Sequence, residues 1–214
     1  YASGNMLVKT WMGKVASAMT TYQKSCFKRF FEELKMTQAL NLPYLPKIID
    51  FGLSTSTACV YLVTEMVKGE AWSTVIEGLT EDEKNELSLQ LLHSLKKFHE
   101  HGFQHGNLDD EKILVDKTNL KVSFNDCFHP EVPQPDSSNA YFPSDIEDPT
   151  VIQCDNFTAL KLIADLYDID LAVDDVASMD PTLSWLNTAL SIEGMEDPSV
   201  RYIDNSRFIE AFEC

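Results

Sequence analysis

Apolar residues recur along the chain in two patterns, and each pattern predicts one kind of secondary-structure element. Short β-branched and aromatic runs predict strands, and they fall at residues 6–11, 60–66, 113–115 and 120–123. Residues 48–52 predict the end of a strand and a turn. Apolar positions spaced three and four residues apart predict helices, and they fall at residues 25–40, 81–101 and 155–167.

Two of the helices carry capping signals. Thr80 and Glu83 form the T-x-x-E pattern of a capping box, and Gly102 stands where a C-terminal cap is expected. Ser25 is the candidate N-cap of the earlier helix. These residues predict where the two long helices begin and where the second one ends.

The charge balance changes which partners are expected. The 214 residues include 17 Lys and Arg against 34 Asp and Glu, a formal net charge of −17. Nucleic acids and anionic membranes bind cationic surfaces, so neither is expected as the main partner. No apolar run approaches the roughly 18 residues of a membrane-spanning helix, and the start has no signal-peptide pattern. The acidity is explained by solubility, and binding to a protein with a basic surface is the alternative explanation.

The five cysteines are widely spaced, at positions 26, 59, 127, 154 and 214. This spacing matches neither a zinc site nor a disulfide framework, so we expect reduced thiols and a cytoplasmic location. The chain starts on Tyr1 rather than Met. We therefore expect it to be cut from a longer protein.

The stretch from His105 to Val115 carries the most specific signal, reading H-G-N-L-D-D-E-K-I-L-V. It resembles the catalytic loop of protein kinases, H-R-D-L-x-x-x-N followed by an apolar strand. In that family the Asp accepts the proton of the substrate hydroxyl and the Asn holds magnesium. Here Asn107 and Lys112 stand at those positions, and neither an amide nor an ammonium has that chemistry. The resemblance implies a kinase loop, packed through His105, with a degenerate catalytic centre.

Other motifs follow in the order of the family. Lys9 resembles the strand lysine that pairs with ATP phosphates, with Lys14 as a rival. Glu33 takes the place of the helix glutamate that pairs with this lysine. The residues after the third strand resemble the hinge between kinase lobes, where backbone groups of Glu65 and Val67 would meet an adenine. The resemblance thus implies a nucleotide site formed by these residues and Lys112.

The later motifs imply structural roles. Asp155 resembles the Asp that opens the central helix of the second kinase lobe. Asp145 stands for the Glu of the A-P-E motif, and Arg201 ends a D-P-x-x-R motif at residues 197–201. The family pairs this Arg with this Glu, so the resemblance implies an Asp145–Arg201 ion pair. It also implies a last helix at residues 205–212.

The metal-binding Asp of the family's D-F-G motif has three candidate positions here. Alignment on the strand at residues 120–123 places it at Phe124, which binds no metal. Alignment on the catalytic loop moves it to Asn125, and a two-residue slip moves it to Asp126. The preferred interpretation is that the Asp is lost at Phe124, with Asp126 as the alternative.

The resemblance covers nearly all of the chain from Lys9 onward and implies an α+β, two-lobed protein kinase-like fold. Residues 1–66 would form a small β-rich N-lobe with one major helix. Residues 67–214 would form a compact, mainly helical C-lobe. Only eight residues precede Lys9, so the glycine-rich phosphate loop is expected to be absent or to lie upstream.

A kinase fold without its catalytic groups implies a pseudokinase rather than an enzyme. We expect an allosteric regulatory or scaffolding domain in a larger signalling protein, as in the general-control translation-factor kinases or the Janus kinases. Its partner would be a protein, such as a linked or separate kinase domain. No cofactor is required, and ATP would bind without magnesium, held by Lys9 and Lys112.

Two alternative functions remain open. The chain could be a free-standing interaction protein, such as a microbial effector, whose acidic surface occupies a basic partner. It could also be an atypical nucleotide-dependent transferase that uses Asp109, Asp110 or Asp126.

Overall fold

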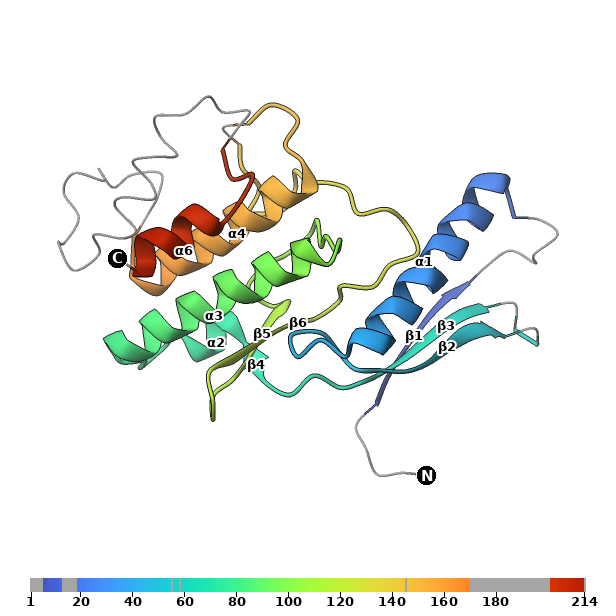
Figure 1. Ribbon diagram of the computed structural model, residues 1–214, viewed down its shortest axis with the longest axis horizontal. Coiled ribbons are helices and arrows are strands. Elements are labelled where there is room, and N and C mark those ends of the chain that lie inside the picture. Colours follow the sequence, from blue (N-terminus) through green and yellow to red (C-terminus); the bar gives the residue numbers. More distant parts are fainter. Residues whose placement is uncertain are drawn as a thin grey trace. The chain divides into compact units, whose positions relative to one another are not determined.

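The computed structural model describes residues 6–12, 19–54, 56–57, 59–144, 146–169 and 201–213. The chain divides into two units, Tyr1–Lys68 with Ser123–Val132 and Gly69–Val122 with Pro133–Cys214 (Figure 1). The sequence-based boundary lay between residues 66 and 67 and left 123–132 in the second lobe. This segment joins the first unit because it is bonded there: the Phe124 N–H donates to the Tyr44 carbonyl at 2.9 Å.

The first unit contains an antiparallel three-stranded sheet in the order β1-β3-β2. Its strands are β1 (Met6–Met12), β2 (Ile48–Ser54) and β3 (Cys59–Glu65). Helix α1 (Thr21–Leu40) lies against this sheet (Figure 1). Trp11 meets Phe30 edge-on with ring centroids 5.2 Å apart, and Phe31 stacks on Phe51 at 5.9 Å. These aromatic contacts join the helix to both edge strands.

The start of α1 differs from the sequence prediction. The N-cap is Thr20, not Ser25, and Thr20 forms a capping box with Gln23. The Ser25 hydroxyl instead donates to the Tyr22 carbonyl at 2.7 Å, inside the helix. A Ser within the first turns bonds to a preceding carbonyl as readily as it caps, so composition alone misplaced the start. The helix ends on Asn41, which adopts a left-handed conformation with φ 46°.

The second unit is mainly helical, with one small sheet in the order β4-β5-β6. The strands are β4 (Glu70–Ala71), β5 (Ile113–Asp116) and β6 (Lys121–Phe124), and the last two residues of β6 belong to the first unit. The helices are α2 (Trp72–Val75), α3 (Glu81–Glu100), α4 (Val151–Leu166) and α6 (Ser206–Glu213). The capping box of α3 is confirmed, because the Thr80 and Glu83 side chains each bond to the other's backbone N–H.

The core of the second unit lies between its helices. It is made of apolar side chains that α3 and α4 bury completely: Leu87, Leu91, Leu95, Phe98, Ala159, Leu160 and Ile163. The Asn205 side-chain amide donates to the Leu92 carbonyl at 2.8 Å and so ties the start of α6 to α3. Helix α4 begins at Val151, four residues before the predicted start, because Thr150 caps it together with Gln153. Asp155 therefore lies inside α4 rather than at its head.

Candidate functional site

The loop between α3 and β5 is anchored to α4 by one carboxylate. Asp155 is fully buried, and its two oxygens accept from the backbone N–H groups of His105 and Gly106, both at 2.9 Å. His99 Nε2 lies 3.2 Å from the same carboxylate. A buried carboxylate is stable only when its charge is compensated by hydrogen bonds or an ion pair. Asp155 thereby fixes the start of the loop that carries Asn107.

Replacing Asp155 with Ala should destabilise the protein strongly. Two buried backbone N–H groups would lose their acceptor, at about 1–3 kcal/mol each. For a chain of this size each kcal/mol lowers the melting temperature by about 2–4 °C, so we expect a drop of roughly 5–15 °C. Calorimetry or circular dichroism measures it, with Glu86→Ala, an exposed carboxylate on α3, as the control. An Asp155→Ala midpoint equal to that of the control would contradict the anchoring role.

Gly106 is the residue that lets the loop turn at this anchor. Its φ of +74° lies in the region that residues with a Cβ rarely adopt. An added Cβ would also lie 3.1 Å from the Gln134 carbonyl oxygen and 3.1 Å from Pro133 Cβ. The close approach of residues 133–134 explains a glycine here.

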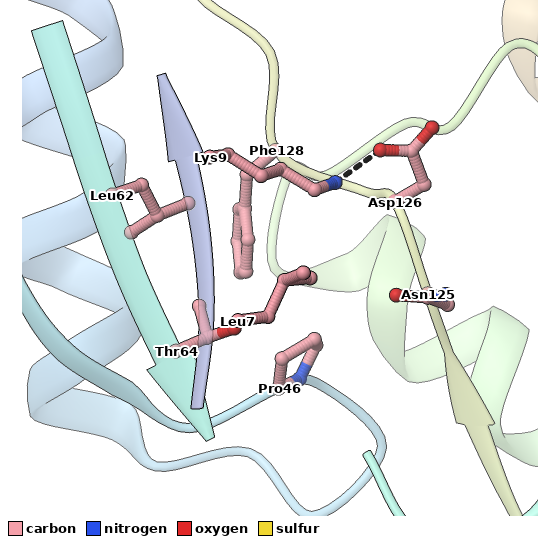
Figure 2. A pocket seen from close by; sticks show the side chains of 8 residues that line it. All are labelled: Leu7, Lys9, Pro46, Leu62, Thr64, Asn125, Asp126 and Phe128. Atoms are coloured by element: carbon pink, nitrogen blue, oxygen red, sulfur yellow. Dashed lines mark hydrogen bonds and ion pairs between the residues drawn. The ribbon is translucent and has the colours of Figure 1, made fainter. Parts of the chain in front are cut away.

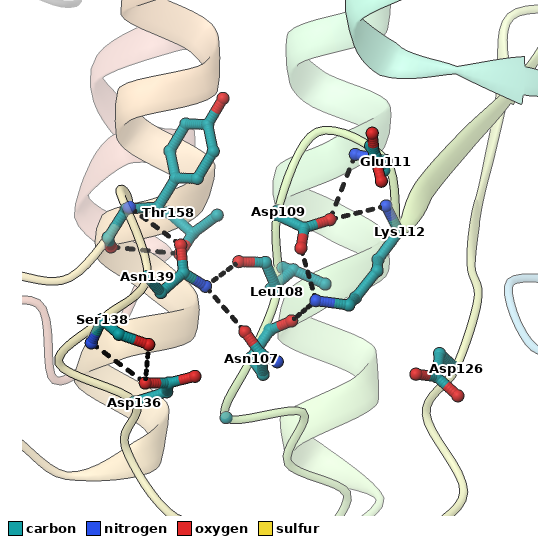
Figure 3. A network of polar contacts seen from close by, with 12 residues as sticks. Asn107, Leu108, Asp109, Glu111, Lys112, Asp126, Asp136, Ser138, Asn139 and Thr158 are labelled. Carbon is teal, nitrogen blue, oxygen red and sulfur yellow. Dashed lines mark hydrogen bonds and ion pairs between the residues drawn. The ribbon is translucent and has the colours of Figure 1, made fainter.

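Asn107 is exposed and bonded to a second segment of the same unit (Figure 3). Asn139 Nδ2 donates to Asn107 Oδ1 and to the Leu108 carbonyl, both at 2.9 Å. Asn139 Oδ1 accepts from the Tyr141 N–H at 2.9 Å. The segment that contains Asn139 is therefore bonded to the residue at the position of the catalytic base.

Lys112 is engaged within the loop itself. Its Nζ donates to the Asn107 carbonyl at 2.7 Å and forms an ion pair with Asp109 (Figure 3). Asp109 Oδ1 also accepts from the N–H groups of Glu111 and Lys112, at 3.1 and 2.9 Å. Asp109 is thus the internal cap of the turn and not the spare carboxylate considered from the sequence. The predicted phosphate contact of Lys112 would require it to exchange these partners.

Asp110 lies beside Tyr141 of the same unit. Burial raises the pKa of the Tyr141 hydroxyl, and the nearby carboxylates of Asp110, Asp165 and Asp109 raise it further. The hydroxyl therefore stays protonated at neutral pH, and Asp110 is one of the carboxylates near it.

In the first unit, Lys9 forms an ion pair with Asp126 (Figure 2). Both side chains line a small cavity of about 10 Å³ together with other residues of that unit: Leu7, Pro46, Leu62, Thr64, Asn125 and Phe128. Asp126 adopts a φ of 57°, which is uncommon for a residue with a side chain. His129 Nε2 donates to the Asp126 carbonyl at 2.9 Å. The strand lysine thus has a carboxylate beside it.

Phe124, which was aligned with the metal-binding Asp of the family, lies in the core of the first unit. Its side chain is fully buried and meets Tyr44 edge-on, with ring centroids 6.2 Å apart. A fully buried ring cannot stand at the exposed position of a metal ligand. The side chain beside Lys9 is that of Asp126, two residues later. The geometry thus favours the alternative alignment over the preferred one, because the chain continues past β6 before the carboxylate faces the lysine.

Glu33 does not pair with Lys9 in this structure. Its carboxylate accepts from Arg29, one turn earlier on α1, while Lys9 pairs with Asp126. Arg29 Nη2 also donates to the Pro130 carbonyl at 3.3 Å. Burial raises the pKa of the Glu33 carboxyl, and the Arg29 guanidinium opposes that rise. The pairing implied by the resemblance is therefore absent, because each member has a nearer partner.

Glu65 and Val67 lie at the end of the first unit. The Glu65 N–H donates to the Lys47 carbonyl at 2.9 Å, and its carboxylate pairs with Lys47 Nζ at 3.1 Å. The Glu65 N–H is therefore bonded within the first unit, and the contact of the Glu65 backbone with an adenine stays a prediction. Val67 lies just past β3 and is half-buried. Its contact with a nucleotide stays a prediction.

Other predictions fall outside the described residues. These include Asp145, the rival lysine Lys14 and the first four residues of the D-P-x-x-R motif. The Asp145–Arg201 pair cannot be placed for that reason. Arg201 itself is described, and its carbonyl accepts from Gln153 Nε2 at 2.8 Å.

Among the described residues, His, Cys, Asp and Glu form no group of three or more suited to a metal ion. Burial raises the pKa of the Cys127 thiol to about 12, opposed in part by Lys9. A thiol with that pKa stays protonated and is a poor nucleophile at neutral pH. The described helices include none that is both long and apolar enough to cross a membrane.

Two residues of the site were missed from the sequence. Arg29 could have been found, since an Arg four residues before a Glu on a helix predicts an ion pair. Asn139 could not, because a polar residue in a Pro-, Ser- and Asp-rich segment is typical of any exposed loop.

Comparisons with known proteins bear on the fold and the activity. Residues 7–125, more than half of the chain, match the family described as the protein kinase domain. The serine/threonine-protein kinase pkn2 of Myxococcus xanthus is 32% identical over 98 residues, which are 45% of this chain and 12% of that protein. The matched segment is thus a small part of the relative's length.

Three solved structures are similar in fold. The PknI kinase domain of Mycobacterium tuberculosis gives a TM-score of 0.59 at 16% identity, over 97% of this chain and 84% of that one. The PK-1 kinase of the Cydia pomonella granulovirus gives 0.64 at 13%, over 99% and 87%. Rad53, solved in complex with AMP-PNP, gives 0.62 at 17%, over 96% and 57%. These likenesses confirm the predicted α+β, kinase-like fold. The prediction of a non-enzyme is contradicted by the match to the protein kinase domain and by the curated relative, which is named a serine/threonine-protein kinase.

Proposed function

Because this chain belongs to the protein kinase domain family, we propose that it binds ATP and transfers its γ-phosphoryl group to serine or threonine hydroxyls of a protein. The observation that carries this proposal is the Lys9–Asp126 pair. It joins a cation suited to phosphate and a carboxylate suited to a metal. The name of the Myxococcus relative supports the hydroxyl substrate, and the AMP-PNP bound to Rad53 supports the nucleotide.

The residues beside Lys9 fit a magnesium ion. Magnesium takes oxygen ligands and in kinases is held by one or two carboxylates and the nucleotide phosphates. The Asp126 side chain is 40% exposed and so can reach such an ion. Magnesium bound there would neutralise charge on the transferred phosphoryl group. The expectation of metal-free binding assumed that the metal-binding Asp is lost, and the present proposal assigns that role to Asp126 instead.

Residues of the chain itself bind the phosphates and position the acceptor hydroxyl. Lys9 binds phosphate oxygens through its ammonium, exchanging its contact with Asp126 when the nucleotide enters. The loop at residues 105–112, fixed by Asp155, positions the acceptor hydroxyl. Asn107 cannot remove the proton of that hydroxyl. The hydroxyl proton passes instead to an oxygen of the transferred phosphoryl group. Because phosphoryl transfer depends mainly on positioning and charge stabilisation, the missing base slows transfer by about 10²- to 10⁴-fold without abolishing it.

Thermal unfolding with ATP and magnesium tests the binding step. A ligand at about 100 times its Kd adds about 2.7 kcal/mol to the free energy of unfolding, which raises the midpoint by roughly 5–10 °C. We expect this rise in the wild type, a smaller rise without magnesium and almost none in Lys9→Met. Phosphate binding at Lys9 explains the difference between these proteins.

Lys47→Met is the matched control for this experiment. Lys47 also belongs to an ion pair of the first unit, but its side chain is 61% exposed, against 24% for Lys9. The control should keep the full nucleotide-dependent rise. Equal rises in Lys9→Met and the wild type, or a rise that ignores magnesium, would overturn the proposed site.

We also propose that the substrate is a basic protein, since the net charge of −17 attracts cationic partners. The regulatory partner expected from the sequence, a linked or separate kinase domain, remains a further proposal. Weakening of substrate binding with salt would support an electrostatic contact.

A further inference from the structure

The orientation of the Asn107 amide is determined by the backbone of its own unit. An amide side chain can be turned so that its oxygen and nitrogen exchange places, and only its hydrogen-bond partners decide between the two. The orientation of the Asn139 amide follows directly from two backbone groups. Its Nδ2 faces the Leu108 carbonyl, which only accepts, and its Oδ1 faces the Tyr141 N–H, which only donates.

The same logic then fixes Asn107. The Asn139 atom that faces Asn107 is the donor Nδ2, so the Asn107 atom 2.9 Å away must be the acceptor Oδ1 (Figure 3). The NH2 group of Asn107, an exposed residue, consequently lies on the side of the amide that faces away from Asn139. No described residue accepts a hydrogen bond from it.

We propose that Asn139 is a positioning residue, which holds the Asn107 amide so that the loop offers an NH2 donor to an oxygen of the group being transferred. This inference rests on the proposed function, because it assigns a role in phosphoryl transfer. It extends that function by replacing an absent base with a fixed hydrogen-bond donor. The ligand chemistry it selects is an oxygen lone pair, and above all a charged phosphoryl oxygen.

The chemistry of phosphoryl transfer suits such a donor. Negative charge spreads over the equatorial oxygens of the transferred group, and a hydrogen bond to a charged group contributes about 1.5–3 kcal/mol. The reversed amide would present its oxygen and repel the same charge. Without Asn139, Asn107 can adopt either orientation. The fixed orientation therefore favours the transfer step and leaves ATP affinity unchanged, since the hydrogen bonds of the Asn139 side chain go to the loop and to its own segment.

Asn139→Ala tests this role through its dependence on residue 107. In the protein with Asn107, we expect kcat to fall by about tenfold and KM for ATP to stay within about twofold. In an Asn107→Asp background the same change should cost much less, because a carboxylate has two equivalent oxygens and no orientation to fix. Ser138→Ala is the matched control, since the Ser138 hydroxyl bonds only to Asp136 of the same turn. It should leave kcat unchanged in both backgrounds.

A merely structural role for Asn139 predicts a different pattern. If Asn139→Ala lowers kcat equally in both backgrounds, the variant has changed the shape of the loop and not the orientation of the Asn107 amide. That result overturns the proposal. No fall with Asn107 present would overturn it as well.

Hydrogen exchange of the side-chain amides, followed by NMR, separates this inference from the proposed function. Both Asn139 amide protons are hydrogen-bonded, so they should exchange slowly, and the Asn107 amide protons should exchange fast. Fast exchange at Asn139 would overturn the positioning role whatever the turnover. Slow exchange without turnover in any variant would instead reject the phosphoryl transfer, and with it the role assigned to this geometry.

Discussion

Asn107→Asp should raise the rate of phosphoryl transfer by about 10²- to 10⁴-fold, the usual contribution of a general base. The structure already accommodates the carboxylate. Asn139 Nδ2 donates to Oδ1 of residue 107 at 2.9 Å, and a carboxylate oxygen accepts the same bond. Asp and Asn have nearly the same shape, so no neighbour must move. An exposed aspartate is ionised at neutral pH, so the new base should be active there.

The measurement is kcat for phosphorylation of a basic peptide that contains serine and threonine. Asn107→Ala is the control, because it removes the amide without supplying a base and should give no gain. The thermal midpoints of the three proteins should agree to within a few degrees, since residue 107 is exposed. An Asn107→Asp rate equal to or below that of the wild type would show that the loop does not position an acceptor hydroxyl.

Asp126→Asn should lower magnesium-dependent transfer by about 10³-fold. Stabilisation of transition-state charge by a bound metal contributes several kcal/mol, and each 1.36 kcal/mol is a factor of ten in rate. The cost in stability should be small by comparison. The Lys9–Asp126 pair is partly exposed, at 24% and 40%, and pairs of that kind contribute about 1 kcal/mol or less. The loss should therefore appear in turnover and not in folding.

Asp50→Asn is the matched control for this variant. Asp50 is an exposed carboxylate on β2 of the same unit, and its removal should leave turnover unchanged. If Asp126→Asn retains magnesium-dependent turnover within a few-fold of the wild type, Asp126 is not the ligand. The loss of the metal-binding Asp at Phe124, as first inferred from the sequence, would then stand.

The sequence predicted which helices and strands are present better than where each of them begins and ends. Among the described elements, β1, β3 and the three long helices were found, because strand and helix periodicities are local. The turn predicted within residues 48–52 was wrong, since Asp50 to Gly52 lie inside β2. The capping box of Thr80 and Glu83 was found for the same reason. The start of α1 was not, since Ser25 and Thr20 are both acceptable caps and only the folded helix distinguishes them.

In the site, too, local motifs were predicted and contacts between residues far apart in the chain were not. The loop from His105 onward and the anchoring Asp155 follow from motifs in the sequence, and the structure joins them. The choice between Phe124 and Asp126 did not follow, because it depends on how far the chain runs past β6 before a side chain faces Lys9. Asn139 was missed because its partner is 32 residues away in the chain, and no local pattern predicts such a contact.

Transfer of labelled γ-phosphate from ATP to the basic serine- and threonine-containing peptide tests the central claim most directly. We predict slow incorporation by the wild type into phosphoserine or phosphothreonine, lost when magnesium is chelated and lost in Asp126→Asn. Wild-type incorporation no greater than that of Asp126→Asn, with ATP and magnesium saturating, would contradict the account.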